Sequence, residues 1–277
     1  MNKTLSKYLL LAFAALLPLT SVASDEMFKP QTPTLANGNS IDNDTDDNLL
    51  KAALKGWHVR IGAGLNIGGT APLPLPREIR DIRSYSPKFN VAIEGDVHKL
   101  FNKSKWGMLL GVRLETKGMK TDAGVKNYHM EAVNADGSGK INGAWTGGVV
   151  TEVSLSCLTF PVLATYDISP RWQVSAGPYF SWIYNGKFTG EAHDGYIRDQ
   201  NPTGEKAEVT RATYDFSNDL RRFNWGVQAG GMFKAYKHLA VRADLQWGLN
   251  GIFPSDFSSV TFDLYPIYAT VGFAYLF

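Results

Sequence analysis

Residues 56–67 read GWHVRIGAGLNI, and this stretch decides the fold because apolar residues alternate without interruption with polar or small ones. Successive side chains of a β-strand point to opposite faces, whereas the apolar face of a helix recurs about every 3.6 residues. The stretch therefore predicts a β-strand with one apolar and one polar face. The apolar face carries Trp57, Val59, Ile61, Ala63, Leu65 and Ile67, and the other carries His58, Arg60, Gly62, Gly64 and Asn66.

The same alternation recurs in seven later segments, so the chain is expected to be all-β. It is ambiguous in the segment 151–167, where Val153 and Leu155 share the apolar face opposite Glu152, but both faces are apolar after Cys157. A β-bulge that switches the phase of the alternation would explain this change. The other segments are 89–98, 106–115, 172–184, 223–233, 239–249 and 265–277.

Long and short connections alternate between the eight segments. A transmembrane barrel that is inserted from the periplasm has long outer loops after odd strands and tight turns after even strands. The sequence therefore predicts an eight-stranded antiparallel up-and-down transmembrane β-barrel over residues 56–277. The long connections are 68–87, 116–149, 185–221 and 251–263, and the short ones are 99–105, 168–170 and 235–238.

Aromatic residues of the apolar face gather at both ends of the expected strands. Trp106 and Trp172 stand beside short connections, and Trp225 and Trp247 stand nearer long ones. Tryptophan favours the headgroup region of a membrane because one part of the ring is apolar and another donates a hydrogen bond. Two such belts on one face indicate a bilayer. A soluble barrel with these aromatics in its core is the alternative, but its outer face would then be rich in glycine.

Two segments are expected before the barrel. Residues 1–23 have the pattern of a secretory signal peptide, with an apolar run at 8–19 that is too short to span a bilayer as a helix. Residues 24–55 form an expected periplasmic acidic linker in which 49–55 could make a short helix. Its DNDTDDN motif departs from a calcium loop at the positions that need glycine and glutamate. The expected location is the bacterial outer membrane.

Composition excludes several classes of protein. The 277 residues include one cysteine, 44% hydrophobic and 19% charged residues, which disfavours a disordered chain, a disulfide scaffold or a helical membrane bundle. The formal net charge of +2 falls to zero once Lys3 and Lys7 leave with the signal peptide, which contains no acidic residue. Nucleic-acid binding then lacks its usual basic footprint, so nucleic acid is not an expected partner.

If lipid bathes the apolar face, the polar face fills the lumen. An eight-stranded barrel is just wide enough for its own side chains, and charges inside it must be paired. We therefore predict a plug of ion pairs, with a narrow ion or water path and a functional acid/base site as the alternatives. The predicted polar network consists of Arg60, Glu94, Asp96, Arg113, Glu115, Glu152, Arg242 and Asp244.

The sequence offers no specific signature of catalysis, of a cofactor or of a metal site, so we expect a non-enzymatic protein with a structural or surface-recognition role. The long connections 116–149 and 185–221 are the expected contact region for an unknown extracellular ligand. The other expected partners are outer-membrane lipid and the barrel-assembly machinery, and the expected state is a monomer. A small channel or porin is one alternative function. A membrane-embedded enzyme acting on lipid or peptide is the other.

Two segments resemble the PorT-like, porin-family outer-membrane β-barrel proteins. Residues 155–183, LSCLTFPVLATYDISPRWQVSAGPYFSWI, are similar to the family's central hairpin, and 225–252, WGVQAGGMFKAYKHLAVRADLQWGLNGI, resemble its penultimate strand pair. The resemblance covers roughly 55–277 and implies the fold, but it gives no specific role. The last residues are similar to the terminal signal that the barrel-assembly machinery reads, which implies that role for Phe273, Tyr275 and Phe277.

Overall fold

The computed structural model describes residues 56–102, 104–134, 140–199, 203–257, 259–260 and 262–277. The chain divides into two units, 1–50 and 51–277, and all of these residues belong to the second. The expected signal peptide (1–23), the acidic linker (24–55) and the short helix within it therefore lie outside the described residues.

The described residues form ten β-strands and one short 3-10 turn, Ser217–Asp219. The predicted all-β antiparallel class is confirmed, and the sheet contains two strands more than the eight that the sequence predicts. No helix in the described part is long and apolar enough to cross a membrane. The strands are β1 (Trp57–Pro72), β2 (Ile79–Pro87), β3 (Asn90–Leu100), β4 (Trp106–Asn134), β5 (Lys140–Asp167), β6 (Trp172–Asp199), β7 (Lys206–Asp215), β8 (Phe223–Lys234), β9 (Leu239–Gly248) and β10 (Leu264–Leu276).

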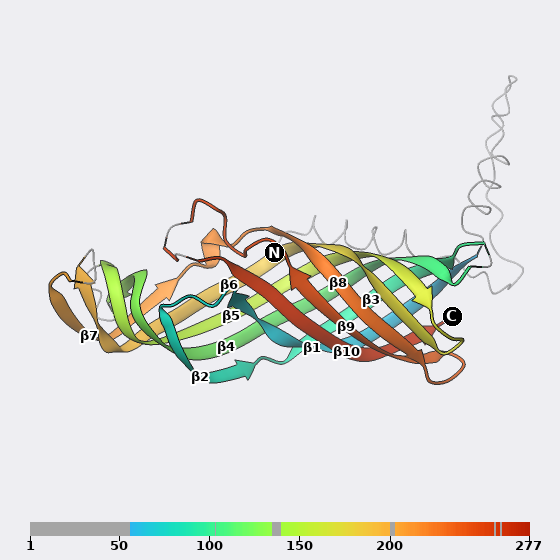
Figure 1. Cartoon of the computed structure of the whole chain (residues 1–277), viewed down its shortest axis with the longest axis horizontal. Coiled ribbons are helices and arrows are strands. Elements are labelled where there is room, and N and C mark those ends of the chain that lie inside the picture. The colour runs from blue at the N-terminus through green and yellow to red at the C-terminus, as the bar shows by residue number, and fades with distance from the viewer. Residues whose placement is uncertain (1–55, 103, 135–139, 200–202, 258, 261) are drawn as a thin grey trace, which may run out of the picture. The chain divides into compact units, whose positions relative to one another are not determined.

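All strand pairs are antiparallel, and the sheet returns to its first strand (Figure 1). Pairing passes from β1 through β3, β4, β5, β6, β8, β9 and β10, and β10 pairs with β1 again. These strands are uneven in length, from 10 residues in β9 to 29 in β4. β2 pairs with β4, and β7 pairs with both β6 and β4, so these two strands add to the sheet beside the others.

Two ends of the sheet are distinguished by their connections. The short connections β3–β4, β5–β6 and β8–β9 lie at one end, which we call the turn end. At the other, the extended end, β4, β5 and β6 continue well beyond the predicted strand limits. We call residues 120–134, 140–152 and 187–199 of these strands, together with β2 and β7, the strand extension (Figure 1). The predicted loops 116–149 and 185–221 are thus mostly strand.

The extension was missed because the pattern inverts rather than ends. We call the part of the sheet outside the strand extension the main wall. There, Ile93 is 54% exposed and Val271 52% exposed, while Arg60 and Glu94 are almost fully buried. Apolar residues therefore face outward there and polar residues face inward, as the alternation predicts. In the extension, inward residues such as Val125 are apolar. This pattern suits strands whose outer face meets water instead of lipid.

β5 shows the same inversion and corrects the prediction for its first half. Val153 and Leu155 are 0% and 1% exposed, so they point inward and not to the outer face. Buried positions recur at every second residue from 153 to 165, and β5 keeps one phase throughout. The irregularity lies on β6 instead, where the partners of Ser156 and Cys157 are Asn185 and Ile183.

The interior consequently has two chemically different regions. Polar and charged side chains fill one region, and they come from β1, β3, β4, β5, β6, β8, β9 and β10. An apolar cluster fills the interior toward the extended end. This cluster includes Met119, Val125, Tyr128, Trp145, Val149, Val153, Leu155, Cys157, Ile183, Phe188, Tyr214, Ile252, Phe253 and Leu264.

Candidate functional site: an ion-pair network inside the sheet

Strand register brings the charged side chains of the interior together. Arg60 of β1 stands directly opposite Asp96 of β3, and Glu94 of β3 stands opposite Arg113 of β4. Side chains that face each other across antiparallel strands lie about 5 Å apart at Cβ, so opposite charges at such positions can pair. β9 supplies the rest of the network from two inward positions, Arg242 and Asp244.

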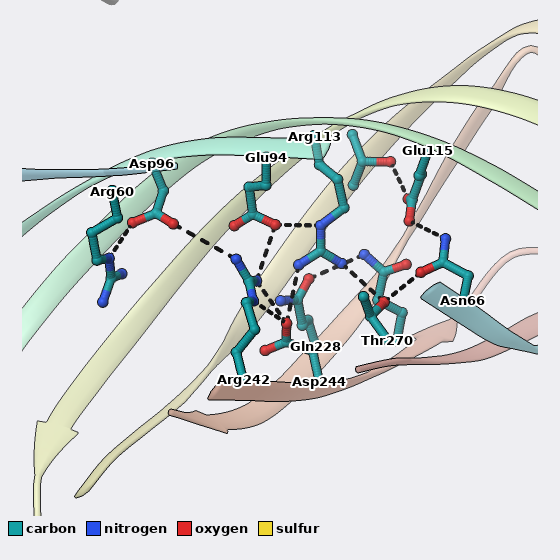
Figure 2. Close-up of polar contacts among 12 residues, drawn as sticks. Arg60, Asn66, Glu94, Asp96, Arg113, Glu115, Gln228, Arg242, Asp244 and Thr270 are labelled. Carbon is teal, nitrogen blue, oxygen red and sulfur yellow. Dashed lines mark hydrogen bonds and ion pairs between the residues drawn. The ribbon is translucent and has the colours of Figure 1, made fainter. Parts of the chain in front are cut away.

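Three guanidinium groups and three carboxylates form one continuous chain of contacts, which Figure 2 shows. Arg60 Nε lies 2.5 Å from Asp96 Oδ1, and Arg113 pairs with Glu94 through Nε. Arg113 Nη2 also lies 3.2 Å from Asp244 Oδ2. Arg242 Nη2 contacts both Glu94 Oε2 at 3.0 Å and Asp244 Oδ2 at 2.6 Å. The charges balance within the set.

A second pair joins this chain toward the extended end. Lys117 Nζ lies 2.9 Å from Glu115 Oε1, and both side chains are buried. Thr159 donates a 2.6 Å hydrogen bond to Glu115 Oε1, and Asn66 Nδ2 donates one of 3.1 Å to Oε2. Thr270 donates to Asn66 Oδ1 at 2.7 Å, and Arg113 Nη1 lies 3.5 Å from the Thr270 hydroxyl. Uncharged residues thus link the two groups of charges.

Seven of the eight predicted network residues meet in the interior, and Glu152 does not. Its side chain is on the outer surface of β5, 35% exposed, and pairs with Lys88 Nζ at 2.7 Å. The error follows from the inverted pattern, since Val153 and not Glu152 is the inward residue. The residues of the predicted assembly signal, Phe273, Tyr275 and Phe277, lie on the outer face at the turn end, 60%, 48% and 64% exposed.

Four residues of the network are not predicted from the sequence: Lys117 and the uncharged linkers Asn66, Thr159 and Thr270. Lys117 continues the inward phase of Arg113 and Glu115, but it stands beyond the predicted end of that strand. Asn66 was placed on the polar face without a role. Thr159 and Thr270 are common residue types, and only the three-dimensional register shows which charges they touch.

Two glycines make room for this network. A Cβ on Gly230 of β8 would stand 2.1 Å from Asp244 Oδ1, so any residue other than glycine at this position would have to displace the carboxylate. A Cβ on Gly111 of β4 would lie 3.2 Å from Asp96 Cβ and 3.3 Å from Glu94 Oε1. The absence of a side chain at Gly111 therefore lets Asp96 and Glu94 pack directly against β4.

Chemically, the network can close the interior but has little room for a ligand. The cavity lined by Arg60, Asp96, Gln173 and Arg242 measures about 20 Å³, which is room for about one water molecule. Arg60 also donates a 2.8 Å hydrogen bond to Gln173, which ties β1 to β6 across the interior. Removing one charge from such a set leaves its partner buried and unpaired, which costs several kcal/mol.

Comparison with known proteins gives one match that decides the family. The model of the outer membrane protein beta-barrel domain matches residues 36–254, which include β1 to β9. None of the curated proteins matches the chain.

Solved structures give distant likenesses. The attachment invasion locus protein Ail of Yersinia pestis, in complex with the heparin analogue sucrose octasulfate, is 11% identical with a TM-score of 0.33. The outer membrane protease OmpT of Escherichia coli is 11% identical with a TM-score of 0.32. Each comparison covers 80% of this chain and 97% of the other. These TM-scores are too low to support an inference. The family match spans most of the chain, and the protein therefore belongs to the outer membrane protein beta-barrel domain family.

Proposed function

We propose that this outer-membrane protein is a barrel with a closed lumen that presents its strand extension at the cell surface for recognition. In this proposal β1, β3, β4, β5, β6, β8, β9 and β10 form the eight-stranded wall, and β2 and β7 belong to the surface structure. The observation that carries the proposal is the neutral ion-pair network that joins β1, β3, β4 and β9 across the interior.

Closure follows from the cost of opening the network. Arg113 is 1% exposed and contacts two carboxylates, so an ion could pass only by separating buried pairs. The charges of the set already balance, and a permeating ion would gain no compensating partner. Separating pairs in a low-dielectric interior is expensive. A steady open pathway is therefore not expected at rest.

Two exposed aromatic belts support the orientation. Trp106, Trp172 and Tyr236 are 56%, 53% and 73% exposed near the turn end. On the opposite side of the apolar band, Phe223 and Trp247 are 68% and 46% exposed. Belts at both headgroup regions would place the turn end in the periplasm and the extension outside the cell. The extension has an apolar interior of its own, so its outer face is free to contact a ligand.

We also propose that the protein has no catalytic activity. Candidate acid/base groups are occupied by structural partners: Glu115 accepts from Thr159 and Asn66 and pairs with Lys117. In the extension, His193 Nδ1 lies 2.9 Å from Asp194 and Nε2 lies 3.3 Å from Asp122. The hydrogen bond with Asp194, followed by that with Asp122, raises the pKa of His193, and these two carboxylates occupy both ring nitrogens.

Biogenesis and partners complete the proposal. Residues 1–23 would direct export, and Phe273, Tyr275 and Phe277 would be read by the barrel-assembly machinery. The mature protein would be a monomer surrounded by outer-membrane lipid, with an extracellular ligand on the extension. A closer kinship with the PorT-like proteins is part of this proposal, and it rests on the hairpins at 155–183 and 225–252.

Planar-bilayer recording tests the closed lumen. The wild-type protein should show no steady openings. A double Arg113→Ala and Glu94→Ala variant should conduct, because it removes one cation and one anion from the contacts that cross the interior to β9. A double Arg211→Ala and Glu191→Ala variant, which removes a pair from the extension, should stay silent. Steady wild-type openings that vanish on replacing Arg60 and Glu94 would instead establish the small channel.

The conductance experiment does not report on catalysis, so the proposed absence of catalytic activity needs its own assay. Purified protein in outer-membrane lipid should cleave neither a random peptide library nor phospholipid. Hydrolysis that is abolished by His193→Gln, with the fold retained, would establish the enzyme alternative.

A further inference from the structure

A separate cavity lies beyond the ion-pair network, inside the extended end of the sheet. Its volume is about 100 Å³, and its lining comes from the end of β1, from β2, β4, β5, β6, β7 and β10, and from Phe216, Val260 and Phe262. Met119, Val125, Val149 and Phe188 form much of its wall, and all residues that line it are uncharged. The ionic groups of the network do not contribute to it.

One polar atom of this wall has no partner. The Thr70 side chain is 2% exposed, and its hydroxyl makes no hydrogen bond with any described residue. The hydroxyl of Tyr268 lies close to that of Thr70, but the two do not meet in hydrogen-bond geometry, and Tyr268 has no other hydrogen-bond partner among the described residues. By contrast, the hydroxyls of Thr151 and Tyr214 lie 2.7 Å apart, and Tyr214 also donates to the Val150 carbonyl at 2.9 Å. The unsatisfied hydrogen-bonding capacity is therefore on the Thr70 side.

Both features are unfavourable when the cavity is empty. A buried hydroxyl without a partner loses its hydrogen bonds to water, and apolar walls that face a void lose dispersion contacts. A ligand that fills the void and reaches Thr70 recovers both. An apolar cavity of about 150 Å³ is known to accept benzene, so about 100 Å³ limits the occupant to roughly one small ring.

We propose that this cavity binds a small uncharged molecule with an apolar body about the size of one ring and one hydrogen-bonding group directed at Thr70. The wall excludes charged ligands because it offers no counter-charge. This inference deepens the proposed recognition function by naming a ligand class. It rests on that function in one respect, namely that the extended end faces the outside of the cell. Binding itself does not require a closed lumen.

The probes are phenol and benzene, which differ by one hydroxyl. The full chain is refolded in detergent, and the temperature midpoint of the heat-induced gel shift is measured with and without each probe. Both probes should raise the wild-type midpoint, since a ligand that binds only the folded state stabilises it. Phenol should bind about three- to tenfold more tightly, as expected for one additional hydrogen bond.

Two variants separate cavity binding from uptake into detergent. Ala123→Phe, which adds a ring at the wall, should abolish the shift with both probes, and Val149→Phe serves the same purpose if the first variant does not fold. Thr70→Val should raise the midpoint without ligand and reduce the phenol shift to that of benzene. A shift equal in the wild type and the filled variant would overturn the inference. So would a hydroxyl preference that survives Thr70→Val, or a wild-type cavity that holds water only.

Bilayer conductance of the same preparations keeps the two proposals apart. A silent wild-type protein that binds neither probe would refute the cavity inference alone. A conducting protein that binds phenol in the cavity would refute the closed lumen alone.

Discussion

Arg113 is the residue on which most of the polar interior depends. Its guanidinium group contacts Glu94 and Asp244 and reaches the Thr270 hydroxyl, which bonds to Asn66. These contacts come from β3, β9, β10 and β1, so one side chain connects opposite parts of the wall. The side chain is almost fully buried, and water cannot replace any contact that it loses.

Arg113→Met should therefore destabilise the folded protein by about 3 to 5 kcal/mol, because Glu94 and Asp244 lose a buried counter-charge. The measurement is urea unfolding in lipid vesicles followed by tryptophan fluorescence. Arg211→Met is the matched control, since Arg211 pairs with Glu191 on the exposed surface and such pairs contribute about 1 kcal/mol or less. Equal losses in the two variants would contradict the structural role given to Arg113.

At this scale, the sequence predicts the composition of the network better than its connections. Alternation alone assigned Arg60, Glu94 and Arg113 to one face. Which cation meets which anion depends on register, and register places Arg60 opposite Asp96 and Glu94 opposite Arg113. Nothing local in the sequence states this pairing, because the partners are separated by an entire connection.

At the scale of the strand, the environment of the outer face decides the pattern. β10 exposes Val271 and Phe273 along the main wall, whereas β7 buries Val209 and Tyr214 and exposes polar residues such as Thr210. The two strands therefore have opposite polarity, and the buried positions of β7, at 209, 212 and 214, also change phase once. A search for apolar-outward strands finds β10 and overlooks β7 and β2, and β2 is exposed along nearly its whole length.

This difference predicts opposite responses to the same substitution. Val271→Arg should destabilise the protein in a bilayer by about 2 to 4 kcal/mol if the position lies near mid-membrane, because a charge then enters hydrocarbon. Thr210→Arg on β7 should change the free energy of unfolding by less than about 0.5 kcal/mol, because its outer face meets water. Urea unfolding in vesicles and in detergent measures both. If Val271→Arg is equally stable in the two media, lipid does not bathe that face.

At the scale of the whole molecule, the two interior regions differ in polarity and in their position along the strands. The charged region lies within the band whose outside is apolar, and the apolar region lies where the strands extend beyond that band. In each region, the polarity of the inward side chains is opposite to the polarity of the outward ones. Composition and alternation predict the first region, but the second requires knowing that strand pairing continues past the membrane, as β4 and β5 do up to the pair Val133 and Lys140.

The end of the chain offers a test of how the whole molecule is assembled. Phe277 is 64% exposed, its ring contacts Tyr275, and its backbone amide donates one 3.2 Å hydrogen bond to the Val59 carbonyl. Such a residue adds little to the stability of the folded sheet, so deleting it should leave refolding in detergent nearly unchanged.

Membrane assembly should respond differently, because the deletion removes the last aromatic residue of the proposed recognition signal. The amount of heat-modifiable protein in outer-membrane fractions should fall several-fold relative to the wild type. Phe101→Ala is the control, since Phe101 is also an exposed aromatic residue near the turn end but lies in the β3–β4 connection. Normal membrane levels after deletion of Phe277, or an equal fall with Phe101→Ala, would show that the terminal residue is not read during assembly.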